Sequence, residues 1–525
     1  MRVLIVSLCI LLSHLAQADT PPVVKTRSGS VSGVTAHGVE SFKGIPFAAA
    51  PIGNLRWRAP QPVSPWVGVR AAHTPGAICM QVPWLNNKSF GTERRDMSED
   101  CLTLDVVRPI PLRTAGAKKL PVMVWIYGGA LTTGASSLPT YDGTVFARGG
   151  VVFVAINYRV GRLGFFVHPT LVQENADNGR LGNYGLMDQI AALQWVKRNI
   201  AAFGGDPNNV TLFGQNAGAL SIQALMVSPE ARGLFQKAIS QSANGSALYR
   251  RISETGPDGR VSGEAEGEAL AHMWGANAKS LSDLRAIPAD QLTDKSDGTH
   301  PDLTFYLDGK TLTEDLRVAF RGGREAPVPL LIGATAQEFA NNTDPDGVLR
   351  PVITAAQEAS LEPLYGTRPA SIGPLTSDIV FAEPARTLAG LHARNGHPTY
   401  LYIFDVVSHS DAATLKAASH LTDLRYVFGT LSTGNKPIEG ADEARASETI
   451  NAQWRAFGRT GTPNAAGLPT WPKYDGKQIM YLHLNDSGAK VDPRSARLDA
   501  LTALVERTRM ASPPIDQRSQ LAPAL

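Results

Sequence analysis

The chain has 525 residues, of which 43% are hydrophobic and 18% charged, so it can build a large buried core. Its 50 Lys and Arg residues and 47 Asp and Glu residues give a formal net charge of +3. With this balance, and without a long run of Lys or Arg, nothing indicates nucleic acid or an acidic membrane surface as a partner.

The first residues predict an export signal. Arg2 supplies a positive charge, residues 3–12 are almost wholly apolar, and Ala16-Gln17-Ala18 has the small-x-small pattern of a cleavage site. We therefore expect residues 1–18 to be removed and the protein to be periplasmic or secreted. The apolar run is shorter than the roughly 20 residues of a membrane span, and no later segment qualifies, so we expect no membrane anchor.

Removal of this signal leaves two cysteines, Cys79 and Cys101. An oxidising compartment favours a disulfide between them over two free thiols. Two cysteines alone do not make a zinc site, and no His-rich cluster in the sequence completes one. We accordingly expect a disulfide and no metal.

Several short apolar runs are continuous rather than alternating, as expected for strands that are buried on both faces. The clearest are residues 121–126, 151–156, 210–213, 329–332 and 400–404. Between them lie segments with helical spacing, at 185–203 and at 383–393, the second with Pro384 near its start. This alternation predicts an α/β fold with a mostly parallel sheet and helices on both faces.

We predict one catalytic-type domain over residues 19–510 and a loosely held tail over 511–525, where two prolines adjoin. Residues 253–297 are polar, and rich in Gly and Ala in places, and are expected to form part of an insertion over the sheet.

The most informative stretch is residues 210–221, where a strand runs into a tight turn and a helix begins at about Ala217. Gly214 and Gly218 are small enough for strand and helix to approach closely. This is the pattern of a nucleophile elbow, G-x-S-x-G, but Asn216 occupies the position of the serine.

From about residue 24 to residue 481 the chain resembles the type-B carboxylesterase and cholinesterase family. The matching segments are residues 42–48, 53–58, 98–104, 203–207 and 460–464, with Trp471-Pro472 near the end. The segment at 98–104 is similar to the family's cysteine signature, although Asp105 follows where asparagine is usual. The resemblance implies an α/β-hydrolase fold with loop insertions over the active site, and hydrolysis of small carboxylic esters without a cofactor.

The resemblance also implies the partners of the nucleophile position. Glu338, a few residues beyond a strand that ends in glycine, matches the family's acid. His420 precedes the Tyr-Val-Phe-Gly segment at 426–429 by six residues, as the family's histidine does. His409 has the wrong spacing and is a distant second candidate. The order Asn216, Glu338, His420 follows the nucleophile–acid–base order of the fold.

The segment Tyr127-Gly128-Gly129-Ala130-Leu131 is similar to the family's glycine loop. By position, the backbone N–H groups of Gly129 and Ala130 would join that of Ala217 as an oxyanion hole. Such donors are often worth about 3 kcal/mol each in the transition state. Ala130 replaces the last glycine of the usual run, a departure expected to narrow the site.

The resemblance also implies three contacts with a structural role. These are the ion pairs Arg56–Glu99 and Arg159–Asp188 and the disulfide Cys79–Cys101. Substrate choice is expected to lie in loops over the sheet, at 79–101 and in parts of 253–325. Arg94 and Arg95 in the first loop suit an acidic substrate, but paired arginines are usually only solvated. The sequence indicates neither the particular ester nor the oligomeric state.

Asparagine cannot act as the serine does, because its amide is a poor nucleophile. Loss of the nucleophile leaves about 10³–10⁴-fold acceleration over water in model serine hydrolases. Ser221, Ser240 and Ser242 are interpreted as structural and not as replacements. Three hypotheses follow: an esterase silenced at one residue, a natural pseudo-esterase that binds without turnover, or catalysis by water or by a deamidated Asn216.

Overall fold

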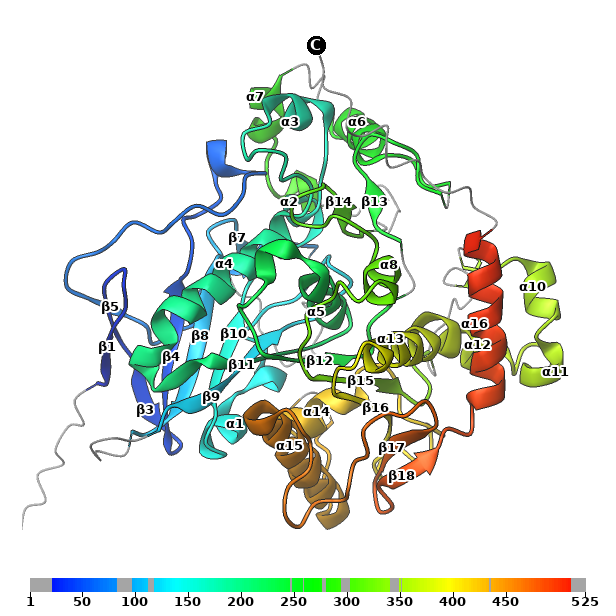
Figure 1. The fold of residues 1–525 in the computed structure, drawn as a ribbon. Coiled ribbons are helices and arrows are strands. Elements are labelled where there is room, and N and C mark those ends of the chain that lie inside the picture. Colours follow the sequence, from blue (N-terminus) through cyan, green and yellow to red (C-terminus); the bar gives the residue numbers. More distant parts are fainter. Residues whose placement is uncertain are drawn as a thin grey trace, which may run out of the picture.

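The computed structural model describes residues 21–82, 97–111, 118–245, 248–257, 259–275, 280–293, 303–339, 349–350, 352–433 and 436–510. The predicted signal peptide, the predicted tail, Arg94 and Arg95 therefore lie outside the described residues. An 11-stranded sheet runs through the middle of the fold in the order β18-β17-β16-β15-β12-β11-β9-β10-β8-β4-β3 (Figure 1).

The centre of the sheet is parallel and its edges are antiparallel. The parallel strands are β9 (Leu120–Ile126), β10 (Val152–Ile156), β11 (Gly205–Gln215), β12 (Lys237–Gln241), β15 (Leu330–Thr335), β16 (Thr399–Asp405) and β17 (Gln478–His483). The antiparallel ones are β3 (Val34–Ala36), β4 (Val39–Pro46), β8 (Thr103–Pro109) and β18 (Gly488–Val491). All five predicted strands are confirmed, and each lies in the parallel centre, where continuous apolar runs are buried on both faces.

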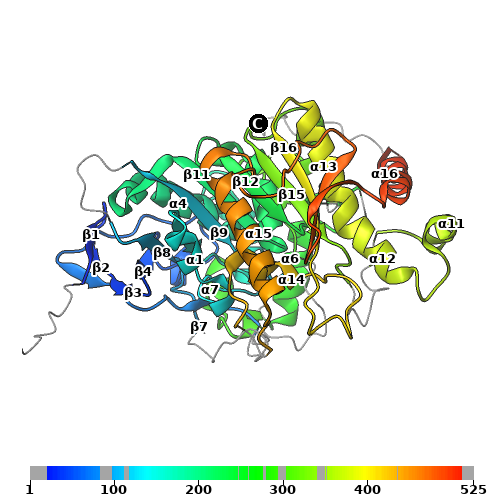
Figure 2. The ribbon, with the colours of Figure 1, turned by 90° about the horizontal axis from the view of Figure 1, so that it is seen from below.

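Helices cover both faces of the sheet, as predicted (Figures 1 and 2). On one face lie α4 (Tyr184–Asn199), α5 (Ala217–Val227) and α13 (Glu383–Arg394). On the other lie α1 (Thr144–Arg148), α14 (Thr422–Phe428) and α15 (Ala441–Thr460). The helix predicted at 185–203 ends its regular part at Asn199 and continues as a 3₁₀ turn over Ile200–Phe203.

Two smaller cores extend the main one. At one end of the sheet, α6 (Gly263–Met273) and α7 (Leu281–Ala286) pack with α3 (Pro169–Glu174) around a second apolar cluster, so part of the predicted insertion is helical. A third cluster joins α12 (Ile372–Ser377) to α16 (Ser495–Met510). Among the described residues, no helix combines the length and apolar character needed to cross a membrane.

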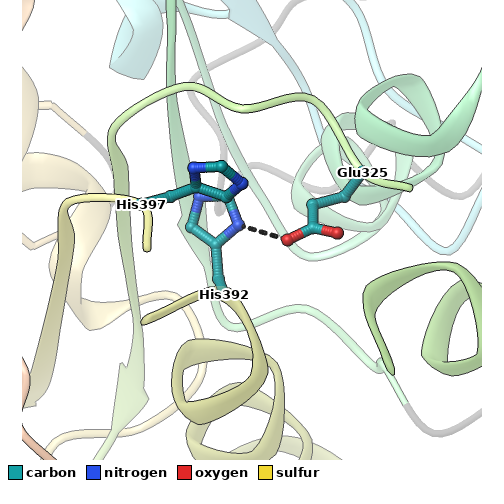
Figure 3. Close-up of side chains that lie close together, drawn as sticks. All are labelled: Glu325, His392 and His397. Carbon is teal, nitrogen blue, oxygen red and sulfur yellow. Dashed lines mark hydrogen bonds and ion pairs between the residues drawn. The ribbon is translucent and has the colours of Figure 1, made fainter. Parts of the chain in front are cut away.

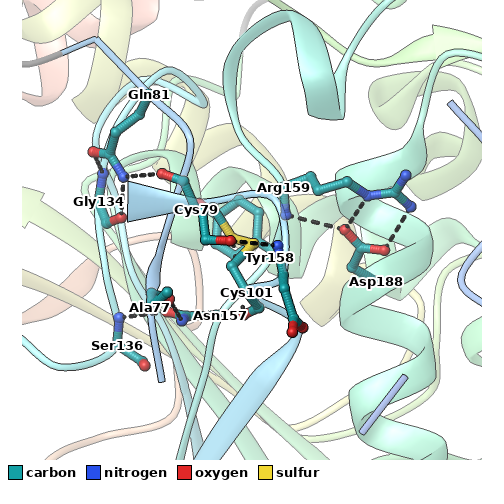
Figure 4. The surroundings of a disulfide bond; sticks show 12 residues. Ala77, Cys79, Gln81, Cys101, Gly134, Ser136, Asn157, Tyr158, Arg159 and Asp188 are labelled. Carbon is teal, nitrogen blue, oxygen red and sulfur yellow. Dashed lines mark hydrogen bonds and ion pairs between the residues drawn. A yellow bond between two sulfur atoms is a disulfide. The ribbon is translucent and has the colours of Figure 1, made fainter. Parts of the chain in front are cut away.

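The disulfide Cys79–Cys101 is present, and both cysteines are buried (Figure 4). The side chain of Gln81 donates to the carbonyl oxygens of Cys79 and Gly134, at 2.9 Å each, and accepts from the Gly134 N–H at 2.8 Å. Residue 134 lies three residues beyond the predicted oxyanion loop, which spans 127–131. The disulfide segment therefore supports the loop that carries two expected catalytic donors.

The two expected ion pairs lie in the same part of the molecule. Arg56 binds both oxygens of Glu99, at 2.7 and 2.6 Å. Arg159 binds both oxygens of Asp188, at 2.8 and 2.7 Å, and the Asp188 side chain is fully buried. Charges buried to this degree need such partners, and both expected pairs are present.

Replacing both cysteines with serine is expected to lower the free energy of unfolding by about 3 kcal/mol, because the disulfide restricts the unfolded chain. The cysteines are 22 residues apart in sequence. Urea unfolding of the double variant beside the oxidised parent measures the loss, and the reduced parent is the matched control. Equal stability of all three samples would contradict a stabilising role for the bridge.

Candidate active site

The turn at Asn216 has the backbone shape of an elbow. Strand β11 ends at Gln215, helix α5 begins at Ala217, and Asn216 between them has φ 57° and ψ −124°. The backbone N–H of Asn216 donates to the Gln241 carbonyl at 2.9 Å. Asparagine tolerates a positive φ better than most side chains, so the residue fits this turn.

The two glycines of the motif allow this close approach. A Cβ added to Gly218 would lie 1.9 Å from the Ile126 carbonyl oxygen, and one added to Gly214 would lie 2.6 Å from the same atom. Such distances are sterically impossible without a backbone shift. Strands β9 and β11 and helix α5 can therefore meet only because both positions lack side chains.

The loop after β9 directs two backbone donors at the elbow. The N–H groups of Gly129 and Ala130 each donate to Oδ1 of Asn216 at 3.0 Å. Gly129 has φ 115°, and Ala130 and Leu131 have φ values of 54° and 60°. This strained loop orients consecutive N–H groups toward one point, as an oxyanion hole requires. The third expected donor, Ala217, directly follows Asn216 as the first residue of α5.

Glu338 and His420 meet beside the elbow, although 82 residues separate them in sequence. Oε2 of Glu338 pairs with Nδ1 of His420, and Oε1 accepts from the Thr335 N–H at 2.7 Å. Nε2 of His420 lies 2.8 Å from Nδ2 of Asn216. The Glu338 side chain is 1% exposed and the His420 side chain is 24% exposed. The carboxylate is therefore buried, whereas the imidazole is partly accessible to solvent.

The hydrogen-bond pattern fixes the proton on His420. Nδ2 of Asn216 can only donate, so Nε2 of His420 is the acceptor and the ring proton is on Nδ1, toward Glu338. Nε2 of Gln215 also lies near the acceptor atom, at 3.3 Å. Burial lowers the pKa of His420, but the charge of Glu338 and its hydrogen bond outweigh burial, and the pKa is raised above 6.5.

The Asn216 amide therefore fills two positions. Its nitrogen lies where a nucleophile would face His420, and its oxygen takes both loop donors. A substrate carbonyl would have to displace this oxygen to reach the same N–H groups.

A buried acid lies behind His420 and was not predicted from the sequence. Asp423, on α14, accepts from Nε2 of Gln241 at 2.7 Å, and Oε1 of Gln241 accepts from the Trp454 indole at 3.1 Å. Burial, with repulsion from Glu338, raises the pKa of Asp423 to about 7. Gln241 also holds the elbow backbone, so this network connects Asp423 to Asn216. In the sequence, the only sign of Asp423 is its position three residues after the predicted histidine, His420.

The alternative candidates lie away from the elbow or point elsewhere. The His409 side chain is 64% exposed and pairs with Glu443 at 2.8 Å. The Ser221 hydroxyl donates to the Ala217 carbonyl within α5 at 2.8 Å. Ser240 and Ser242 are buried at the end of β12, as expected of structural residues.

All three site residues lie on the side of the sheet where its parallel strands have their carboxyl ends, the side on which such sheets bind ligands. Asn216 follows β11, Glu338 follows β15, and His420 precedes α14. This arrangement is that of an α/β-hydrolase. A family model described as "Carboxylesterase family" matches residues 20–348 and 353–500. The chain belongs to the carboxylesterase family.

Relatives and solved structures agree with this assignment. The para-nitrobenzyl esterase of Bacillus subtilis is 36% identical over 480 residues, which cover 87% of this chain and 93% of the relative. The fumonisin B1 esterase of Sphingopyxis macrogoltabida is 34% identical over 485 residues, covering 88% and 86%. A solved PNB esterase structure superposes with a TM-score of 0.80 at 33% identity, over 92% of this chain and 99% of that one.

Proposed function

We propose that this site is a carboxylic ester hydrolase site that Asn216 silences. In the serine form, His420 would take the hydroxyl proton as the oxygen attacks the ester carbonyl. Glu338 would hold the imidazole in the Nδ1–H tautomer and stabilise the imidazolium. Gly129, Ala130 and Ala217 would donate to the oxyanion. The observation that carries the proposal is that both loop donors and His420 converge on one side chain, that of residue 216.

Two effects of Asn216 add to each other. The amide supplies no hydroxyl for His420 to deprotonate, and its oxygen occupies two of the donors meant for the substrate. We therefore expect the chain as written to lose both the covalent step and most of the electrostatic stabilisation. The substrates of the serine form would be small carboxylic esters, and the amino-terminal pattern favours action after export.

A pseudo-esterase is the second candidate function. The observation that favours it is the hydrogen-bonded state of the Asn216 amide, which leaves a stable site without a reactive group. Such a protein would bind an ester or a partner without turnover. Failure of the serine form to hydrolyse any ester while the fold stays intact would favour this candidate.

The pH dependence of the Asn216→Ser variant is expected to show an acid limb with its midpoint above pH 6.5. The base must be neutral, and Glu338 raises the pKa of His420, so activity is lost as pH falls through that raised value. Asp423, which ionises near pH 7, adds a second negative charge close by. The profile of kcat/KM against pH measures this limb, and a midpoint below 6.5 would contradict the predicted effect of Glu338.

A substrate-independent test uses a fluorophosphonate, which phosphonylates an activated serine. The Asn216→Ser variant is expected to gain one phosphonyl group, mapped by mass spectrometry to residue 216, while the chain as written stays unlabelled. The Asn216→Ser,His420→Ala variant is the control and should label far more slowly. A folded serine variant that resists labelling would overturn the proposed function.

A further inference from the structure

A second polar cluster lies at the other end of β15 from Glu338. Glu325 is in the loop between α8 (Leu316–Arg321) and β15, His392 is on α13, and His397 is in the turn between α13 and β16 (Figure 3). One potential ligand atom from each residue lies within 4.8 Å of the others. The cluster is therefore formed by three segments that converge at the start of two neighbouring strands.

Both ring nitrogens of His392 lie next to oxygen atoms that accept hydrogen bonds. Nε2 lies 2.8 Å from the Val328 carbonyl oxygen, which can only accept, so Nε2 carries a proton. In the neutral ring, Nδ1 then has a lone pair, and it lies 2.9 Å from Oε1 of Glu325. Two lone pairs this close require a shared proton or a metal ion between them.

The Glu325 carboxylate is also incompletely satisfied. Its side chain is 0% exposed, and Oε1 accepts from the Asn395 amide at 2.9 Å. Oε2 is buried and has no hydrogen-bond partner among the described residues. A buried carboxylate oxygen without a donor is costly, and a bound cation is one way to satisfy it.

His397 offers a third donor from the solvent side. Its ring centroid lies 4.7 Å from that of His392, and it is partly exposed on a turn that includes Gly396. Its ring nitrogens form no hydrogen bond with the described residues. The side chain is therefore available as a ligand on the exposed side of the buried pair.

We propose that Glu325, His392 and His397 form a binding site for a zinc-type divalent cation. Two imidazoles and a carboxylate, with water as a fourth ligand, are a common zinc donor set. The Val328 carbonyl holds the His392 tautomer, as backbone carbonyls often do for metal-bound histidines. Tetrahedral zinc places its donors about 3.3 Å apart, and the three potential ligand atoms lie within 4.8 Å of one another, so binding would bring them closer by at most about 1.5 Å.

The site would be structural and not catalytic. It joins the end of α13 to the loop before β15, whereas Glu338 follows the opposite end of that strand. A bound ion would stabilise the folded state because the three ligands converge only there. No metal was predicted from the sequence, because its cysteines and histidines form no local zinc pattern and Glu325 is 67 residues from His392.

The test is zinc titration of the full chain, purified without a polyhistidine tag and stripped with a chelator, in competition with a chromophoric chelator. We expect one zinc per chain in the parent and binding at least about 100-fold weaker in His397→Ala. His272→Ala is the matched control, because His272 is an exposed histidine on α6, in a different part of the fold. Absent stoichiometric binding, or equal binding by parent and His397→Ala, would overturn the proposal.

A second measurement separates metal binding from a proton-bridged pair. Zinc is expected to raise the melting temperature of the parent and of His272→Ala, but to leave that of His397→Ala unchanged. Glu325→Gln keeps the side-chain shape and removes the charge, so it should also lose the zinc response. If zinc shifts all four melting temperatures equally, the ion binds elsewhere and the cluster is a buried imidazolium–carboxylate pair.

Discussion

Asn216→Ser is expected to raise kcat for a short-chain p-nitrophenyl ester by about six orders of magnitude or more over the chain that carries Asn216. The partners of the missing hydroxyl are already in place, because Nε2 of His420 presents a lone pair 2.8 Å from Nδ2 of Asn216. Steady-state kinetics of the two proteins, with circular dichroism to match their folding, measure the change.

The size of this effect has two sources. Serine supplies the nucleophile, whose removal alone costs about 10⁶ in kcat in a model serine hydrolase. Its shorter side chain also frees the N–H groups of Gly129 and Ala130, which the amide oxygen otherwise takes at 3.0 Å. No backbone change is required, since the elbow conformation at φ 57° is already formed.

Asn216→Ala is the control that separates the two sources. Alanine has no nucleophile, but it leaves the loop donors open to a substrate carbonyl. We expect it to hydrolyse the ester about 10- to 100-fold faster than the chain as written, which corresponds to the cost of displacing the amide from its hydrogen bonds. Equal rates for the alanine variant and the chain as written would show that the amide does not block the donors.

The second large effect concerns Glu338. In the Asn216→Ser background, Glu338→Gln is expected to lower kcat by about 10⁴, as loss of the acid does in a serine protease. Glutamine cannot stabilise the imidazolium that forms on proton transfer, and it can donate to Nδ1 and so favour the wrong tautomer. The same change should move the acid limb of the pH profile downward, because the negative charge that raises the pKa of His420 is gone.

Glu443→Gln in the same background is the matched control for Glu338. Glu443 also pairs with a histidine, since its Oε1 lies 2.8 Å from Nδ1 of His409, but this pair lies outside the elbow. We expect kcat to stay within a factor of about two of the serine variant. A large loss of kcat at Glu443 and none at Glu338 would instead support His409 as the base, the candidate that its spacing disfavours.

Much of the fold could be predicted from the sequence because its signals are local. Five continuous apolar runs became strands of the parallel centre, and Gly214 and Gly218 identified the elbow through backbone contacts that exclude a Cβ. For the helix predicted at 185–203, only the end differed from the structure. The regular helix ends at Asn199, and a 3₁₀ turn completes the segment. A 3₁₀ turn often ends an α-helix, and its side chains at i and i+3 also lie on one face, so the spacing of apolar residues does not show where the α-helix ends.

The remaining features depend on contacts between distant segments. The amide of Asn216 bridges a loop 87 residues before it and a histidine 204 residues after it. Asp423 meets Gln241 across 182 residues, and burial, which no local pattern reports, raises the pKa of that carboxyl. The meeting of Glu338 and His420 beside Asn216 was predictable only through family resemblance, since an isolated acid or histidine carries no such information.

We propose that residues 216, 338 and 420 form a covalent esterase site that lacks only its nucleophile. The most direct measurement is the pre-steady-state burst of p-nitrophenol, whose amplitude counts acyl-enzyme formed per chain. We predict an amplitude near one for Asn216→Ser and none for the chain as written, whose mass at residue 216 should match asparagine and not aspartate. A burst of equal amplitude from a chain with intact asparagine would contradict the claim, because another residue would then be the nucleophile.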